Sequence, residues 1–243
     1  MVADRPSELD SYPHVALAVY AHPDDPDVSC GGTLAKWCRA GSEVHVLICT
    51  DGGKGTVDPS MTTVRLAEMR KREMAEAGEV IGVFGHHLLG HPDGELDESK
   101  LRKEIVYWIR YLRPEAVVCP DPTAIFFGDS YFNHRDHRSV GWAVLDAISP
   151  SASLPLYFPD AGPPHKVKVV YLSGTLEPNH WVDISSTIEL KCMAISCHRS
   201  QLSGGGELEQ QVVRERAKAE GMTAGMAYAE AFRLLELVDS PNG

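Results

Sequence analysis

The sequence predicts an α/β fold in which helices cover both faces of a mostly parallel sheet. Short apolar segments with the length of buried strands alternate with longer segments of helical composition in the first half of the chain. Their spacing matches βαβ units, in which a helix crosses back between two parallel strands. The length of 243 residues and the 43% hydrophobic content provide enough apolar surface for a sizeable core.

Each element expected in the first half has a recognisable end. The strand at 14–20 is almost wholly apolar and is followed by Pro23. The helix at 31–40 stops at Gly41, because glycine favours the position after a helix. The helix at 62–78 is rich in Ala, Met, Glu, Lys and Arg, which are strong helix formers. The other elements expected here are strands at 43–49, 86–89 and 115–119 and a helix at 100–112.

The second half of the chain has a different texture. Five prolines between 150 and 164 indicate a loop-rich crossing, because proline interrupts regular structure. After it we expect a strand at 166–172, a helix at 187–200, a glycine break at 204–206 and a helix at 207–220. We therefore interpret this half as a loop-rich C-terminal elaboration of a Rossmann-like sheet.

Charge and composition exclude several classes of protein. The 23 Lys and Arg against 34 Asp and Glu give a net charge of −11, which disfavours nucleic acids and anionic membranes as partners. The longest apolar run, at 15–21, is too short to span a bilayer, and no signal-peptide pattern opens the chain. The six cysteines contain no CxxC pair and suit reduced thiols. We expect a cytoplasmic protein with one domain over 1–243, a leader at 1–13, and no nucleic-acid partner or membrane insertion.

One group of chemically active side chains follows the first expected strand. The segment 21–25, Ala-His-Pro-Asp-Asp, presents His22, Asp24 and Asp25 at the carboxyl end of that strand, where ligands bind in open α/β sheets. Imidazole and carboxylate are common ligands of divalent transition metals. Pro-Asp-Asp is also a good turn sequence, so a polar turn explains the same residues.

A second group lies at the start of an expected helix. His134, Asp136 and His137 offer two imidazoles and a carboxylate within four residues. A solvated helix N-terminus is the alternative interpretation, because Asp136 would interact favourably with the helix dipole. Together the two groups supply the three protein ligands, with groups to spare, that a catalytic zinc site needs.

Further motifs occur in a characteristic order from residue 15 to about 201. They are Ala21-His-Pro-Asp-Asp25 with Gly31-Gly32, Thr50-Asp51-Gly52, Arg70-x-x-Glu73, Pro92-Asp93-Gly94-Glu95-Leu96, His134-x-Asp136-His137 and His198-Arg-Ser-Gln201. In this ordered set the sequence resembles the PIG-L/LmbE-like family of metal-dependent N-acetylglucosamine deacetylases. The resemblance implies an LmbE-like fold and an amino-sugar substrate, and, because family members often assemble, a homo-oligomer.

The resemblance also implies roles for particular residues. The family's metal ligands correspond to His22, Asp25 and His137, which would hold Zn²⁺ or another divalent transition metal such as Fe²⁺. Asp24 corresponds to its general base. His134 corresponds to a second catalytic group, which protonates the leaving amine or stabilises the oxyanion.

Three more residues have weaker assignments. Arg70 and Asp93 correspond to positions that hold sugar hydroxyls, although an arginine on a helix is usually solvated and Asp93 also suits its Pro-Asp-Gly turn. Asp136 could orient His134, as outer carboxylates often orient catalytic or ligating imidazoles. A helix-capping role explains Asp136 equally well.

These observations predict a zinc-dependent hydrolase that removes the acetyl group from an N-acetylglucosamine-type substrate through attack of metal-activated water. One alternative is an amidase that acts on another N-acyl amino-sugar conjugate. Another is a non-catalytic protein that binds a sugar or nucleotide on the same fold. Asp24 and His134 argue against the binding protein, because binding alone requires neither residue.

Overall fold

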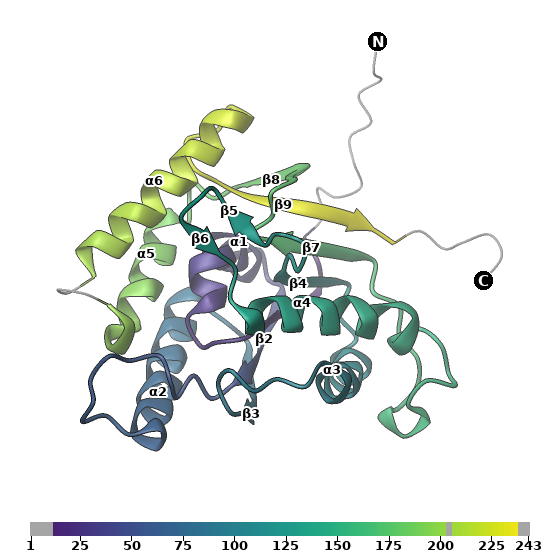
Figure 1. Ribbon diagram of the computed structural model, residues 1–243. Coiled ribbons are helices and arrows are strands. Elements are labelled where there is room, and N and C mark those ends of the chain that lie inside the picture. Colours follow the sequence, from purple (N-terminus) through teal and green to yellow (C-terminus); the bar gives the residue numbers. More distant parts are fainter. Residues whose placement is uncertain (1–11, 203–205, 238–243) are drawn as a thin grey trace, which may run out of the picture.

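The computed structural model describes residues 12–202 and 206–237, and a seven-stranded sheet runs through its centre (Figure 1). The strand order is β3-β2-β1-β4-β7-β9-β8, in which the first five strands run parallel and β9 runs antiparallel to both neighbours. The strands are β1 (Val15–Tyr20), β2 (Glu43–Thr50), β3 (Gly85–His91), β4 (Ala116–Pro120), β7 (Val169–Ser173), β8 (His180–Asp183) and β9 (Ala229–Glu236).

Helices cover both faces of this sheet, as the sequence predicts. Leu17 and Val19 of β1 pack in one core with α3 and α4, whereas Ala18 and Tyr20 pack in the other core with α1 and α2. Both faces of β1 are buried, which explains why its sequence is apolar throughout rather than alternating. The helices are α1 (Asp25–Arg39), α2 (Thr63–Ile81), α3 (Glu98–Leu112), α4 (Arg135–Asp146), α5 (Ile188–Cys197) and α6 (Glu207–Ala224).

Short elements complete the described part of the chain. A two-stranded hairpin of β5 (Phe126–Phe127) and β6 (Tyr131–Phe132) precedes α4. One-turn helices occupy Ala147–Ala152, Pro159–Ala161 and Arg199–Gln201. Most of the expected leader, at 1–11, and Gly204 and Gly205 of the expected glycine break lie outside the described residues. Among the described residues, no helix combines the length and apolar character of a membrane span.

The structure confirms the α/β class and corrects the limits of several elements. The helix expected at 31–40 is part of α1, which begins at Asp25 because Pro26 is tolerated in a first turn. The helix expected at 187–200 ends at Cys197, where His198 leaves the helical conformation. The strand β9 was not expected from the sequence, because its Ala, Glu and Leu content is typical of a helix.

A buried ion pair supports the middle of α1. The backbone of Cys30 departs from helical geometry, with φ −142°, so the second half of α1 begins as a new helix with unpaired N–H groups. Glu230 of β9 accepts hydrogen bonds from the amides of Gly32, at 3.0 Å, and Thr33, at 2.8 Å. Its carboxylate also forms an ion pair with Lys191 of α5, and both side chains are only 4% exposed. This contact ties α1, which carries part of the candidate site, to the end of the chain.

We expect Glu230→Gln to lower the free energy of unfolding by about 3–5 kcal/mol, because it leaves the Lys191 ammonium buried without a counter-charge. Denaturant titration followed by circular dichroism measures the change. The double variant Glu230→Gln/Lys191→Met should recover part of the loss, because it removes the uncompensated charge. A single variant as stable as the wild type would contradict this role.

Candidate metal centre and active site

The predicted site residues gather at the carboxyl edge of the parallel strands. His22, Asp24 and Asp25 follow β1, and Asp93 follows β3. The second group comes from the start of α4, where His134 is the N-cap residue. Since the carboxyl ends of parallel strands share one edge of the sheet, segments more than 100 residues apart meet there, as the contact between His22 and His137 shows.

One nitrogen from each of two imidazoles and the two oxygens of one carboxylate lie at nearly equal separations. His22 Nδ1 lies 3.2 Å from His137 Nε2 and 3.3 Å from Asp25 Oδ2, and His137 Nε2 lies 3.2 Å from Asp25 Oδ1. Ligand atoms about 2.0–2.1 Å from a tetrahedral zinc ion would be about 3.3 Å apart. The separations among His22, Asp25 and His137 are therefore of the size expected between ligands of one divalent cation.

The surroundings of His22 contain other metal-ligating side chains. Donor atoms of His22, His134 and His137 lie within 4.8 Å of one another, and so do those of His22, Asp93 and Asp136. The second set uses the far side of the His22 ring. There, Nε2 lies 3.1 Å from Asp93 Oδ1 and 3.7 Å from Asp136 Oδ2. Carboxylates on this nitrogen hold a ligating imidazole in the orientation that directs Nδ1 to the metal.

Asp136 is completely buried. Its carboxylate hydrogen-bonds elsewhere and not to the His134 ring, which it could have oriented according to the sequence. Its Oδ2 accepts a 2.7 Å hydrogen bond from the amide of Gly94 and lies beside His22. The contact with His134 comes instead from the backbone, because the Asp136 amide donates to His134 Nδ1 at 3.3 Å. Asp136 therefore supports the His22 ring directly and contacts His134 through its main chain.

The concentrated carboxylates shift the titration of the imidazoles. Burial opposes a charge on His22, but the carboxylates around it, that of Asp25 first among them, outweigh this and raise the pKa of His22 to about 12. Burial also lowers the pKa of His137, but the neighbouring Asp25 carboxylate outweighs this effect, so the pKa of His137 is raised. The hydrogen bond from His22 lowers the pKa of Asp93 to about 2. The site therefore attracts positive charge strongly.

Asn133 is a residue of this site to which the sequence analysis assigns no role. Its side-chain Oδ1 lies 3.0 Å from Nδ1 of His137, and its Nδ2 donates to the carbonyl of Ala124 at 3.0 Å. The amide oxygen thus accepts the Nδ1 proton, and Nε2 is the nitrogen of His137 that faces Asp25. The spacing of four residues before His137 is the only sequence signal for this contact.

The Asp24 carboxylate has a different partner from that of Asp25. It forms an ion pair with Arg70 of α2, whose guanidinium also donates to the carbonyl of Gly52 at 3.0 Å. Gly52 has a φ of 62°, and a Cβ there would lie 2.8 Å from Arg70 Nη1, so glycine leaves room for the guanidinium. Asp24 keeps 25% of its side chain exposed, whereas Arg70 keeps 3%.

Arg70 and Asp93, which the family resemblance assigns to sugar hydroxyls, both contact other residues of the site. The Arg70 side chain is buried against Asp24, which leaves little of its guanidinium accessible to a substrate. Asp93 is 6% exposed, and its Oδ1 contacts His22 while its Oδ2 accepts from the amide of Lys54 at 3.2 Å. Both side chains already have partners within the protein, a feature that sequence patterns do not reveal.

His134 lies beside the three candidate ligands and is exposed. Its ring centroid is 5.3 Å from that of His22 and 5.5 Å from that of His137. Partial burial and the neighbouring charge on His22 lower the pKa of His134. Because Nδ1 accepts a backbone hydrogen bond, the neutral ring carries its proton on Nε2. The neutral form of His134 therefore presents its Nε2–H as a hydrogen-bond donor.

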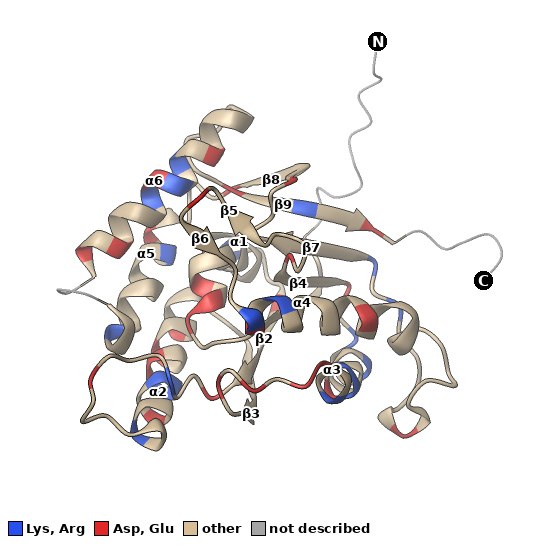
Figure 2. Cartoon of the chain, in the orientation of Figure 1, with Lys and Arg blue, Asp and Glu red and all other residues tan. Residues whose placement is uncertain are grey.

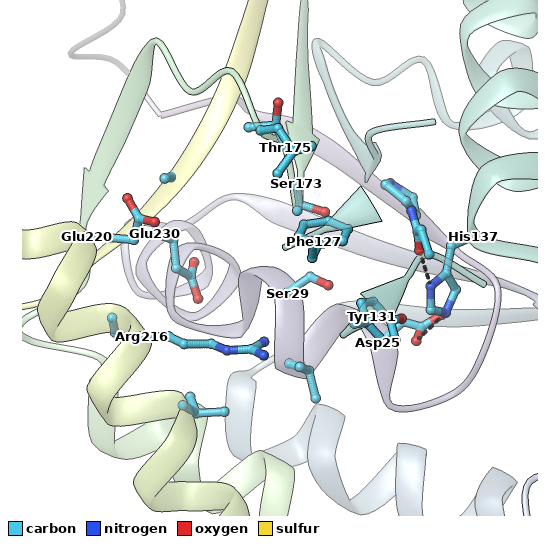
Figure 3. A pocket seen from close by; sticks show the side chains of 18 of the residues that line it. Asp25, Ser29, Phe127, Tyr131, His137, Ser173, Thr175, Arg216, Glu220 and Glu230 are labelled. Atoms are coloured by element: carbon cyan, nitrogen blue, oxygen red, sulfur yellow. Dashed lines mark hydrogen bonds and ion pairs between the residues drawn. The ribbon is translucent and has the colours of Figure 1, made fainter. Parts of the chain in front are cut away.

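A large cavity opens beside these residues (Figure 3). Its volume is about 830 Å³, within the range of small-molecule sites. Asp24, Asp25 and His137 line one part of it, and Phe127 and Tyr131 of the hairpin line the adjoining wall. The two aromatic rings thus form part of the pocket wall.

Comparisons with known proteins agree with this geometry. The family model described as PIG-L, GlcNAc-PI de-N-acetylase, matches residues 17–148. The chain is 36% identical over 225 residues to the diacetylchitobiose deacetylase of Thermococcus kodakarensis, with 90% of this chain and 82% of that protein aligned. It is 30% identical over 180 residues to the 1D-myo-inositol 2-acetamido-2-deoxy-alpha-D-glucopyranoside deacetylase 2 of Saccharopolyspora erythraea, with 64% of this chain and 63% of that protein aligned.

A solved structure agrees with the fold. The N,N'-diacetylchitobiose deacetylase from Pyrococcus horikoshii, complexed with its inhibitor MPG, superposes with a TM-score of 0.85 and 31% sequence identity. The alignment covers 92% of this chain and 84% of that one. Sequence and structure together show that the chain belongs to the PIG-L family of de-N-acetylases.

Proposed function

We propose that this protein is a metal-dependent deacetylase that hydrolyses the acetamide of an N-acetylglucosamine-type substrate. The convergence of His22, Asp25 and His137 on one point, with the carboxylate of Asp24 next to them, is the observation that supports it most. The names of the relatives, which are deacetylases of amino sugars, support the same substrate class. Release of acetate from N-acetylglucosamine derivatives, with and without a chelator, tests the proposal.

The proposed cation site uses two imidazoles and one carboxylate. This donor set suits Zn²⁺ with three protein ligands and an open position, and it also matches the two-histidine, one-carboxylate set that binds Fe²⁺. We propose Zn²⁺ because its tetrahedral geometry fits the ligand spacing. When bound, such a cation supplies Lewis acidity, which lowers the pKa of a coordinated water toward about 7 and polarises the amide carbonyl.

Asp24 is the proposed general base. It adjoins the ligand Asp25 in sequence but faces Arg70, so its carboxylate stays outside the proposed coordination sphere and accessible from the cavity. There it can accept the proton of the attacking water and later deliver it to the leaving nitrogen. Arg70 is the proposed positioning residue, because its guanidinium fixes the direction of that carboxylate.

His134 is the proposed oxyanion donor. The neutral ring has its proton on Nε2, since Nδ1 accepts from the Asp136 amide. A donor aimed at the carbonyl oxygen stabilises the negative charge that develops there as water attacks. Of the two roles that the family resemblance leaves open, this one needs no imidazolium and agrees with the lowered pKa of His134.

The alternatives remain distinguishable from this proposal. An amidase that acts on another N-acyl amino-sugar conjugate would use the same residues, and only a substrate panel separates it. A non-catalytic binding protein has no use for an accessible carboxylate beside three converging donor atoms. The geometry around Asp24 therefore favours a hydrolase.

Removal of the base should abolish turnover without loss of the cation. We expect Asp24→Asn to lower kcat by about 10²–10⁴-fold, because the amide cannot accept the proton of water. Its metal content, measured by elemental analysis, should equal that of the wild type, because Asp24 is not a proposed ligand. Near-normal kcat in this variant would remove Asp24 as the base.

Loss of a proposed ligand should instead lower the affinity for the metal. His137→Ala should weaken metal binding by more than the roughly 10–100-fold that outer-shell substitutions cause. His165→Ala is the matched control, because that ring binds the carbonyl of Pro114, just before β4, at the other end of the strand from the site. Competition with a chelator measures both affinities. Equal metal affinity in His137→Ala and the control would contradict the ligand assignment.

The two roles considered for His134, oxyanion donor and proton donor to the leaving amine, predict different activities for His134→Gln. Gln retains a side-chain N–H donor but cannot act as an acid. We therefore expect the kcat of His134→Gln to exceed that of His134→Ala by roughly tenfold or more. Steady-state kinetics at saturating metal measures the ratio. Equally low kcat in both variants would instead support proton donation by His134.

A further inference from the structure

Two motifs of the sequence contain buried side chains that the proposed reaction does not use. They are Glu73 of Arg70-x-x-Glu73 and His198 of the segment His198-Arg-Ser-Gln201. Glu73 is 5% exposed and His198 is 1% exposed. Buried polar and charged groups are costly unless they are paired, so each of these residues indicates a contact that the fold maintains.

His198 follows the last turn of α5, and its ring contacts the first turn of α1. Its Nε2 lies 2.8 Å from Oδ2 of Asp27, and its Nδ1 has no partner in the part of the chain that the structure describes. Burial opposes a charge on this ring, but the hydrogen bond with Asp27 outweighs this effect, so the pKa of His198 is raised. The contact therefore fixes Asp27, which lies three residues after Asp24.

Glu73 attaches the same segment to α2. Its Oε1 accepts a hydrogen bond from the Ser200 amide at 2.8 Å, and its Oε2 accepts one from the Ser200 hydroxyl at 2.6 Å. Glu73 lies one helical turn after Arg70, which holds the Asp24 carboxylate. Figure 2 shows acidic and basic residues along α2, and among these, all within the described part of the chain, Arg70 and Glu73 are the buried ones. Residues three apart share one face of a helix, so the two buried charges of α2 face the same region.

These contacts form a closed path that begins and ends at the proposed base. Its members, in order, are Asp24, Arg70, Glu73, Ser200, His198 and Asp27. The helix α5 packs against both α1 and α2, so the path connects three helices. Asp24, His198 and Gln201 also line one small cavity of about 270 Å³, which places the segment beside the base. The Asp24 carboxylate is thus held by α2, while the turn that carries it is held by His198.

We propose that His198 is a positioning residue for the general base, which acts by holding Asp27 and hence the turn that carries Asp24. This inference rests on the proposed function, in which Asp24 accepts the proton of the attacking water. A displacement of about 1 Å at a catalytic group can cost a large part of the rate. Because His198 is neither a proposed ligand nor a residue that lines the large cavity, its loss should lower kcat with little change in KM.

The test is a double-mutant cycle with the base. His198→Ala removes the contact with Asp27, and Arg199→Met is the matched control, because that side chain pairs with Glu76 on the surface. Acetate release from N,N'-diacetylchitobiose is measured at saturating metal. We expect His198→Ala to lower kcat by about 10–100-fold and to change KM by less than about twofold, while the control changes neither.

The same substitution in the Asp24→Asn background shows whether His198 acts through the base. There, His198→Ala should lower kcat by less than about twofold, because the group that it positions is already absent. A general loss of stability would instead lower kcat by the same factor in both backgrounds. His198→Gln retains an N–H donor toward Asp27, so its kcat should lie within about threefold of the wild type.

Hydrogen exchange provides a measurement that needs no activity. Mass spectrometry of the peptide at 22–30 should show faster exchange in His198→Ala than in the wild type, because the first turn of α1 opens more often. Exchange in α3, which the closed path does not include, should stay the same.

Three results would overturn the inference. These are a kcat in His198→Ala equal to that of Arg199→Met, an equal loss in the Asp24→Asn background, and unchanged exchange at 22–30. If His198→Ala does not fold, Ser200→Ala passes through the same cycle, because it removes only a hydroxyl contact with Glu73, and its expected loss is about threefold. A wild type that releases no acetate would contradict the proposed function, while the exchange data would still decide whether His198 holds the turn.

Discussion

The concentration of negative charge around one imidazole shapes the whole candidate site. His22 is in contact with the carboxylates of Asp25, Asp93 and Asp136, and a second imidazole, that of His137, also contacts Asp25. Carboxylates so close together and so little exposed are costly unless cations balance them. The segments after β1 and β3 and the start of α4 all contribute to the balance, so the fold and the proposed metal centre depend on the same arrangement.

Two adjacent aspartates acquire different chemistry from this arrangement. Asp25 opens α1 and turns toward the imidazoles, whereas Asp24, at the N-cap, turns toward the buried guanidinium of Arg70. The distinction depends on α2, which brings Arg70 beneath the turn at Gly52. A proposed ligand and a proposed base can therefore stand side by side in sequence without competing for the same cation.

The sequence predicts the parts of this site that follow from strand order and leaves out those that depend on side-chain packing. The parallel topology places the residues after β1 and those before α4 at one edge, so the meeting of His22 and His137 follows from strand order. The burial of Arg70 against Asp24 does not follow, because it depends on how α2 packs. Nor does the strand β9, since Glu230 and its neighbours have a helical composition and pair as a strand through contact with β7 and β8.

The contact between the Glu230 carboxylate and α1 has a consequence for the order in which the chain folds. It contacts amides that lie 197 and 198 residues earlier in the chain. During synthesis, the ribosome must therefore release Glu230 before the kinked helix gains its support. Contacts of such long sequence separation form late and slowly, so the nascent chain carries its acidic turn on an incompletely stabilised helix until β9 has been made.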